Sequence, residues 1–173
     1  MSSNQLKKIP DHIGWYLSGF CDGEGSFNIS LRKKPDYRSG WQVVLSFNVS
    51  QRDRTMLALL KRYLGCGIIK KRRDGLFSYD VTNPNAIADV AIPFFDKYRF
   101  QSAFKKYNFR LFSRAVEIMI SKDHLNQDGL KEILDIREKI NPGRGRTRKY
   151  NINDVINGES STTIRQVSSE TAR

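Results

Sequence analysis

The sequence predicts an α+β fold, in which a four-stranded antiparallel sheet carries helices on one face and leaves the other face open. Helix-like and strand-like segments follow one another in the order αββαββα. The strand-like segments alternate apolar and polar residues, which is typical of a sheet with one buried face. A strongly basic composition accompanies this pattern.

The first αββ unit begins with a helix that Asp11 is expected to cap and that Gly23 and Gly25 are expected to end. Alternation of apolar and polar residues, with Val44 as the one exception, then predicts two strands, at residues 26–32 and 42–50. The polar run "KKPDYRSG" between them predicts a turn.

The second unit repeats the same order. Asp53 is a candidate N-cap for a helix that ends at Gly65. Residues 66–82 then read as a hairpin, for which Asp74 and Gly75 supply a two-residue turn.

Three helices complete the predicted fold, at residues 84–98, 102–120 and 128–140. The apolar stripe expected on the second of them is formed by Phe104, Tyr107, Leu111, Ala115, Ile118 and Met119. We divide the chain into a domain at residues 1–140 and a poorly ordered, basic, Ser/Thr-rich tail at residues 141–173.

The net charge of the chain limits the class of molecule that it is expected to bind. The 173 residues include 30 Lys and Arg against 18 Asp and Glu, a net charge of +12. Such an excess favours a polyanion, above all nucleic acid, although ribosomal and membrane-surface proteins share it. No apolar run is long enough to cross a bilayer, and Cys21 and Cys66 are expected to be free thiols. We therefore expect an intracellular protein, in a prokaryotic cytoplasm or an organelle, with no membrane partner.

The polar face of the predicted sheet is the candidate binding surface. A half-exposed sheet has a polar outer face in any case, but here basic runs at residues 32–34 and 70–73 lie beside it. Its side chains are of the kinds that bond base edges and phosphates. They are Ser26, Asn28, Ser30, Arg32, Gln42, Ser46, Asn48, Lys70, Arg72, Ser78 and Asp80.

The stretch "WYLSGFCDGEGSF", residues 15–27, places small residues along one side of the first helix. Gly19 and Gly23 are four residues apart, with Ser18 beside them, and such a strip allows two helices to approach closely. Since the chain has no second copy of the strip, a homodimer would supply the partner helix. We expect Ser18, Gly19, Asp22 and Gly23 at that interface.

The acidic residues of this stretch lie where the helix dipole disfavours negative charge. In the homodimer, Glu24 of each subunit would lie near the two-fold axis, where paired carboxylates repel unless a proton or a metal separates them. Oxygen ligands beside DNA phosphates favour Mg²⁺ and metal-assisted hydrolysis. The alternative is that Asp22 and Glu24 are ordinary surface residues after a helix.

Residues Leu17–Gly25, "LSGFCDGEG", resemble the LAGLIDADG motif of homing endonucleases, and the αββαββα order that follows resembles the family core. The resemblance implies that Glu24 binds the metal together with the backbone carbonyl of Gly23, and that Asp22 braces the helix end. It implies Mg²⁺ as the cofactor, with Mn²⁺ or Ca²⁺ also able to occupy the site.

The same resemblance implies two further catalytic residues. Gln51 matches a family position that orders water near the metal. The basic position of the family falls on Lys105 or Lys106, with Lys105 ranked first. A second basic position is left open between Arg52 and Arg54.

A single motif resembles the family members that act as homodimers. The resemblance implies Mg²⁺-dependent cleavage of both strands of a long, near-palindromic double-stranded DNA site, leaving 3′ overhangs. Expected DNA contacts also include the turn residues Lys34, Tyr37 and Arg38 and the tail residues Arg144 and Arg146.

Two other functions fit the same fold. An RNA maturase would bind intron RNA and assist splicing without cutting, which the intact Glu24 disfavours. A DNA-binding regulator would need no acid at the dimer axis.

Overall fold

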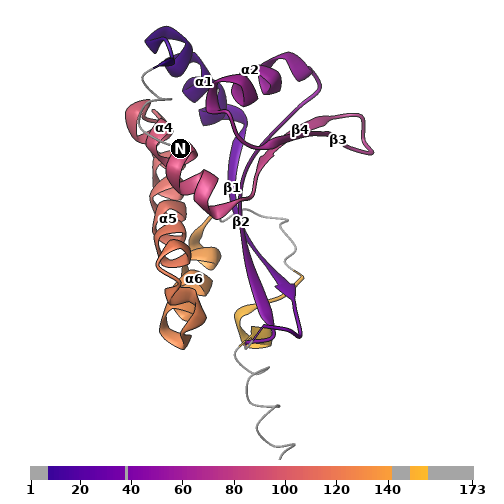
Figure 1. Ribbon diagram of the computed structural model, residues 1–173, viewed down its shortest axis with the longest axis vertical. Helices are drawn as coiled ribbons and strands as arrows, with labels where there is room; N and C mark the ends of the chain where they lie inside the picture. The colour runs from indigo at the N-terminus through magenta and orange to yellow at the C-terminus, as the bar shows by residue number, and fades with distance from the viewer. Residues whose placement is uncertain (1–7, 38, 142–148, 156–173) are drawn as a thin grey trace, which may run out of the picture. The chain divides into compact units, whose positions relative to one another are not determined.

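The computed structural model describes residues 8–37, 39–141 and 149–155. The strands form one sheet in the order β1-β2-β4-β3, which confirms the predicted α+β class with a four-stranded antiparallel sheet (Figure 1). The elements are α1 (Asp11–Glu24), β1 (Gly25–Lys33), β2 (Trp41–Gln51), α2 (Arg54–Leu64), β3 (Ile68–Lys71), β4 (Phe77–Val81), α3 (Pro84–Ala86), the π-helical segment η2 (Ile87–Ala91), α4 (Ile92–Lys97), α5 (Ala103–Ile120), the 3₁₀ segment η3 (Asp123–Leu125) and α6 (Gln127–Lys139). Both cysteines are free.

Two compact units make up the chain: the first comprises Met1–Ile29 and Leu45–Pro142, the second Ser30–Val44 and Gly143–Arg173. Each is described by itself. Within the described ranges, no helix is both long and apolar enough to traverse a lipid bilayer.

An aromatic core holds the first unit together. Phe27 of β1 and Phe47 of β2 are almost fully buried, and their ring centroids lie 5.3 Å apart. Phe95 of α4 packs edge-on against both rings, and Phe112 of α5 lies 5.0 Å from Phe27. The helices therefore cover the apolar face of the sheet, as the alternation predicts, and α4, α5 and α6 lie to one side of the strands in Figure 1.

The hairpin formed by β3 and β4 has a longer turn than the sequence predicts. Lys71 pairs with Phe77, and the Arg72 N–H donates to the Leu76 carbonyl at 2.7 Å, so the loop between them has three residues. The predicted two-residue turn is wrong because Gly75, with φ +83°, forms the left-handed third position of a longer loop. Asp74 still contributes, since its carboxylate accepts from the Leu76 N–H.

Of the two predicted helix N-caps, one is confirmed and the other is wrong. Asp53 caps α2 as expected, accepting from the Thr55 N–H at 2.8 Å, and Gly65 ends that helix with φ +66°. The expectation that Asp11 caps α1 is wrong: the N-cap is Pro10, and Asp11 lies in the first turn. There its carboxylate accepts from the Tyr98 hydroxyl at 2.9 Å and pairs with Lys97.

The buried side of α5 agrees with the prediction at Ala115 and Ile118 and differs from it at the start of the helix. Phe104 and Tyr107 are 55% and 39% exposed, whereas Asn108 and Phe112 are buried. A polar residue was not expected in the core. Asn108 is satisfied there by Asn141, as the reciprocal hydrogen bonds between the two side chains and the Asn141 backbone show.

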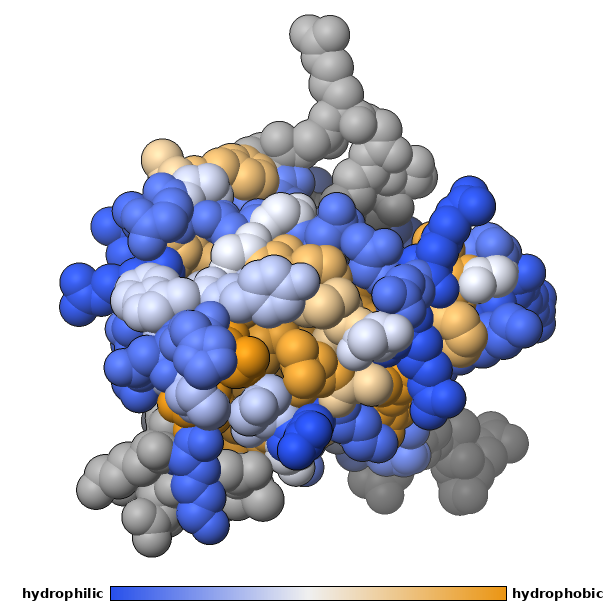
Figure 2. All heavy atoms as spheres, turned by 90° about the horizontal axis from the view of Figure 1, so that it is seen from above, coloured by the Kyte–Doolittle hydropathy of each residue, from blue (hydrophilic) through white to orange (hydrophobic). Residues whose placement is uncertain are grey.

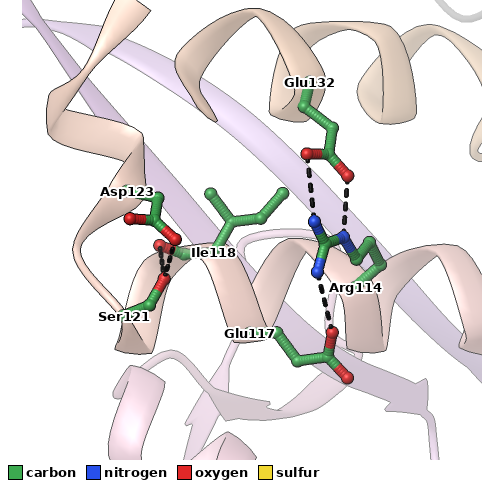
Figure 3. A network of polar contacts seen from close by, with 6 residues as sticks. All are labelled: Arg114, Glu117, Ile118, Ser121, Asp123 and Glu132. Carbon is green, nitrogen blue, oxygen red and sulfur yellow. Dashed lines mark hydrogen bonds and ion pairs between the residues drawn. The ribbon is translucent and has the colours of Figure 1, made fainter. Parts of the chain in front are cut away.

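A charged network joins α5 to α6 on the surface (Figure 3). Arg114 donates from Nε to Oε1 of Glu132 at 2.7 Å and from Nη2 to Oε2 at 3.2 Å, and it also pairs with Glu117. These hydrogen bonds from Arg114 hold the pKa of Glu132 below its ordinary value. The bidentate geometry fixes the register between the two helices.

In the second unit, a segment after the predicted domain packs on the β1–β2 turn region. Tyr150 meets Trp41 edge-on, with centroids 4.7 Å apart, and the ammonium of Lys33 lies 5.6 Å from each ring. Trp41 is 6% exposed as a result of its packing. Tyr150 of the predicted tail thus packs on β2, and the poor order of the tail as a whole stays a prediction.

Candidate functional site

The acidic end of α1 passes into β1 without a loop. The Gly25 N–H donates to the Cys21 carbonyl, and the Gly25 backbone is already extended. A Cβ at this position would lie 2.6 Å from the Cys21 carbonyl oxygen, so only glycine fits. This junction leaves Gly23 and Glu24 exposed at the helix end.

Lys105 is the basic residue that reaches this junction. Its side-chain amine donates to the carbonyl of Gly25, the residue that follows Glu24. Lys105 is half-buried, while Lys106 is exposed. Burial lowers the pKa of Lys105, and the carboxylates of Asp22 and Glu24 act in the opposite direction. The geometry therefore favours Lys105 over Lys106 as the basic partner of Glu24.

Asp22 turns away from the helix end and toward α5. Its Oδ2 accepts from the backbone N–H groups of Gln101 and Ser102, at 2.8 and 2.9 Å, and its Oδ1 accepts from the Ser102 hydroxyl. Partial burial raises the pKa of Asp22, but these hydrogen bonds outweigh it and hold the pKa below its usual value. Asp22 therefore braces the start of α5 rather than the end of its own helix.

Gln51 lies at the end of β2, opposite Phe77 of β4. Its side-chain oxygen accepts from the Arg52 N–H at 3.3 Å. None of the hydrogen bonds described for residues 8–37, 39–141 and 149–155 joins Gln51 to Glu24 or Lys105. Its role stays a prediction, as do those of Arg52 and Arg54.

The polar residues of β2, β3 and β4 share one face of the sheet. Ser78 lies opposite both Ser50 and Lys70, and residues directly opposite in a ladder point to the same side. Arg72 donates to the Ser50 hydroxyl at 3.3 Å. Sequence reasoning left Ser50 out of the candidate set, although its place in the alternation of β2 could have found it.

Other polar residues of this face form hydrogen bonds or ion pairs with neighbouring side chains. Asp80, opposite Asn48, accepts from the Ser78 hydroxyl at 2.9 Å and lies 3.9 Å from the Lys70 ammonium. Ser78 is only 8% exposed, so we place it as a support for Asp80 rather than as a contact residue. On β1, Asn28 donates to the Ser26 hydroxyl, and Ser46 is half-buried on β2.

The second compact unit contains the other residues that are predicted to contact DNA. Gln42 donates to the Tyr37 hydroxyl at 3.2 Å, and Ser30 donates to the Val44 carbonyl. Arg32 and Lys34 are exposed. Three predicted contacts, Arg38, Arg144 and Arg146, lie outside the described residues.

The small-residue strip on α1 is open at two of its four predicted positions. Gly19 and Gly23 are exposed, and a Cβ at either would meet no atom within 4 Å. Trp15 and Tyr16 on the same helix are 48% and 57% exposed. Figure 2 looks onto the end that carries α1 and α2 in Figure 1 and shows apolar side chains in its middle, bordered by hydrophilic ones.

The other two predicted interface positions form hydrogen bonds within the chain, and their place in an interface stays a prediction. Ser18 is 1% exposed and donates to the Tyr98 carbonyl at 2.5 Å, so it faces the interior of its own subunit. Asp22 is directed to the start of α5. Because both side chains are polar, each finds a hydrogen-bond partner within the chain.

The helix end offers oxygen donors that fit a divalent cation. The Glu24 carboxylate is exposed, and the Gly23 carbonyl belongs to the last turn, where helix carbonyls lack intrahelical partners. The negative end of the helix dipole also favours a cation. In the described part of the chain no three His, Cys, Asp or Glu residues cluster as a metal site. The helix end would thus offer a cation one carboxylate and one carbonyl.

An αββαββα chain with a polar sheet face, and with a lysine bonded beside an exposed acid, has the features that the resemblance to homing endonucleases implies. The family model for the LAGLIDADG endonuclease matches residues 17–116, and the chain belongs to this family. The match begins at the motif on α1 and extends into α5.

Known relatives share both the sequence and the fold. "Probable intron-encoded endonuclease 2" of Neurospora crassa is 33% identical over 168 residues, which are 90% of this chain and 37% of that protein. The archaeal intron-encoded homing endonuclease I-Vdi141I, in complex with DNA, has a TM-score of 0.79 at 27% identity, over 87% of this chain and 96% of its own.

A third similar structure is I-SmaMI bound to uncleaved DNA target in the presence of calcium ions. Its TM-score is 0.72 at 36% identity, over 80% of this chain and 46% of that chain. This chain thus spans less than half of the Neurospora relative and of I-SmaMI.

Proposed function

We propose that this chain is a site-specific homing endonuclease. It acts as a homodimer, hydrolyses both strands of a long, near-palindromic double-stranded DNA site with Mg²⁺, and leaves 3′ overhangs. One observation carries the proposal: the half-buried ammonium of Lys105 donates to the carbonyl of Gly25, the residue that follows the exposed Glu24. A metal-binding carboxylate and a positive charge at one place suit phosphodiester hydrolysis, since they activate water and stabilise the charge that develops on the phosphate.

Each residue of the junction has a separate task. The Glu24 carboxylate and the Gly23 carbonyl hold a divalent cation, which supplies Lewis-acid activation of water at the phosphate when bound. Lys105 places a positive charge beside the reacting phosphate and stabilises the negative charge that develops there. Gln51 orders a water molecule. Calcium ions in the I-SmaMI complex with uncleaved DNA support divalent binding in a relative.

The polar sheet face reads the DNA. Polar residues of β2, β3 and β4 share that face, and strands enter the major groove in several DNA-binding folds. The exposed basic residues Lys70 and Arg72 contact phosphates or base edges from β3 and the turn after it. Arg144 and Arg146, in the tail after the domain, contribute phosphate contacts.

The open glycine strip supports the homodimer. Gly19 and Gly23 leave α1 free for close approach by a second helix, and each subunit then brings one Glu24 to cut one strand. I-Vdi141I is covered over 96% of its chain by a single copy of this fold. The near-palindromic target is the DNA counterpart of that two-fold symmetry.

A cleavage selection tests the proposal. The purified protein is incubated with a randomised, near-palindromic DNA library in Mg²⁺, and the cut ends are sequenced, in parallel with Glu24→Gln. The control is Glu117→Gln, which removes the same charge from the surface of α5. We expect the wild type and the control to yield one long site with 3′ overhangs, and Glu24→Gln to yield none.

Two outcomes would contradict the proposal. One is uncut DNA under all conditions, with intron RNA enriched in a parallel binding selection, which is the maturase result. The other is cleavage by Glu24→Gln at the wild-type rate, which would remove the acid from the mechanism.

A further inference from the structure

One side chain of the motif has no task in the proposed chemistry, yet it makes more polar contacts than its neighbours. We infer that Asp22 is a positioning residue, which holds the first turn of α5 so that Lys105 reaches the Gly25 carbonyl beside Glu24. The inference concerns how the chain builds its site, and it rests on the proposed function of Lys105.

The contacts of Asp22 are all with the two residues before α5. Both carboxylate oxygens are used: Oδ2 accepts from the Gln101 and Ser102 N–H groups, and Oδ1 from the Ser102 hydroxyl. These donors belong to the unsatisfied start of a helix, which a carboxylate stabilises by hydrogen bonding and by the helix dipole. Asp22 lies 80 residues from Ser102 in the sequence, so the bond joins distant parts of the chain.

Ser102 passes this constraint to Lys105. Ser102 is the N-cap of α5, and its hydroxyl oxygen accepts from the Lys105 N–H at 3.3 Å while donating to Asp22. Its carbonyl accepts from the Lys106 N–H at 3.0 Å. The backbone of Lys105 is therefore fixed within one turn of the residue that Asp22 holds.

The side chain of Lys105 needs such support because its position is unfavourable by itself. Its ammonium is half-buried, and burial lowers its pKa. A lysine side chain is long and flexible, and it loses rotamer freedom when it is held in one place. If the first turn of α5 shifts, the ammonium can leave the Gly25 carbonyl for water at little cost.

A chemical-labelling experiment on the DNA-free protein tests the link without any cleavage. The protein reacts with a limiting amount of acetic anhydride, and fragment-ion mass spectrometry compares Lys105 with the exposed Lys106 in the same peptide. In the wild type we expect Lys105 to react several-fold more slowly than Lys106. In Asp22→Ala we expect the two rates to converge, with an intermediate ratio in Asp22→Asn, which keeps one acceptor oxygen.

The matched control is Asn83→Ala. Asn83 caps α3, accepting from the Ala86 N–H at 3.1 Å, so this variant also loses a helix cap. We expect it to leave the ratio of Lys105 to Lys106 labelling unchanged. An unchanged ratio in Asp22→Ala, or an equal change in Asn83→Ala, would overturn the inference.

A double-mutant cycle then tests the consequence for catalysis. We expect Asp22→Ala to lower the single-turnover cleavage rate about 10- to 100-fold, the scale of a misplaced catalytic group, with little change in DNA affinity. In the Lys105→Ala background the same change should have no further effect. Independent, multiplicative losses would contradict positioning through Lys105 and leave the proposed function intact. Wild-type cleavage by Glu24→Gln would instead reject the proposed function, while the labelling ratio still decides the link between Asp22 and Lys105.

Discussion

The side-chain amine of Lys105 donates a hydrogen bond to the backbone carbonyl of Gly25, across 80 residues of sequence. This bond places a positive charge next to the exposed Glu24. We predict that Lys105→Ala lowers the rate of DNA cleavage at least 100-fold while site binding persists, because the charge acts on the reacting phosphate. Single-turnover cleavage and a binding titration measure the two quantities.

Lys106→Ala is the matched control, since it removes the same charge from the neighbouring, exposed position. It is expected to keep the cleavage rate within a few-fold of wild type. The reverse pattern, with Lys106→Ala inactive and Lys105→Ala active, would exchange the two assignments.

Two glycines of α1 should respond in opposite ways to the same substitution. A Cβ at Gly14 would lie 2.2 Å from the buried ring of Tyr98, whereas a Cβ at Gly19 would meet nothing within 4 Å. We predict that Gly14→Ala lowers the free energy of unfolding by about 1–3 kcal/mol through overpacking. Gly19→Ala should not destabilise the subunit, since alanine favours a helix by about 1 kcal/mol.

The two glycines should also differ in how their substitution affects self-association. If Gly19 lies between two copies of α1, Gly19→Ala should weaken the homodimer, which analytical ultracentrifugation measures. An undiminished dimer in Gly19→Ala would place the interface elsewhere.

The buried Asn108 and the half-buried Asn141 form a reciprocal pair. The Asn108 amide donates to Oδ1 of Asn141 at 3.0 Å and accepts from its backbone N–H at 3.1 Å, and Asn141 also donates to the Phe27 carbonyl. Asn108→Ala leaves the groups of Asn141 without these partners. Since an unsatisfied buried group costs about 1–3 kcal/mol, we predict a loss of that size or more in urea unfolding. The exposed Asn126, whose side chain caps nothing, is the control, and Asn126→Ala should change stability by under about 0.5 kcal/mol.

Acid should weaken the link between α5 and α6. Hydrogen bonds from Arg114 hold the pKa of Glu132 below its ordinary value. A depressed pKa in the folded state stabilises the fold above the ordinary value, about 4.3, and this contribution is lost as the pH falls through the native pKa. We predict that Glu132→Gln is less stable than wild type at pH 7 and that the difference becomes smaller at pH 3. A difference of equal size at both pH values would show that the ion pair does not cause it.

The sequence correctly predicted the features that depend on residues close together in the chain. The alternation of Phe27 and Ile29 with polar neighbours fixed the buried face of β1, and Asp53 identified the start of α2 because its bond reaches only two residues along the chain. The motif at the end of α1 located Glu24, and the ranking of Lys105 agrees with its contact to Gly25.

Long-range contacts account for what the sequence could not predict. The burial of Asn108 on α5 was missed because Asn108 is satisfied by a residue 33 positions away, and no periodicity encodes that partner. The hydrogen bonds of Ser18 and Asp22 were missed because their partners, Tyr98 and Ser102, lie 80 residues further along the chain. The prediction of a two-residue hairpin turn was wrong because Asp74 and Gly75 fit both a two-residue and a three-residue loop.

The most direct test of the central claim compares the wild type with Glu24→Gln on the selected DNA site, measuring affinity in Ca²⁺ and single-turnover cleavage in Mg²⁺. The substitution keeps the size of the side chain and removes its charge. We predict that the variant binds the site with wild-type affinity within a few-fold and cuts neither strand. Cleavage by Glu24→Gln at the wild-type rate would show that the exposed acid at the end of α1 is not the centre of the reaction.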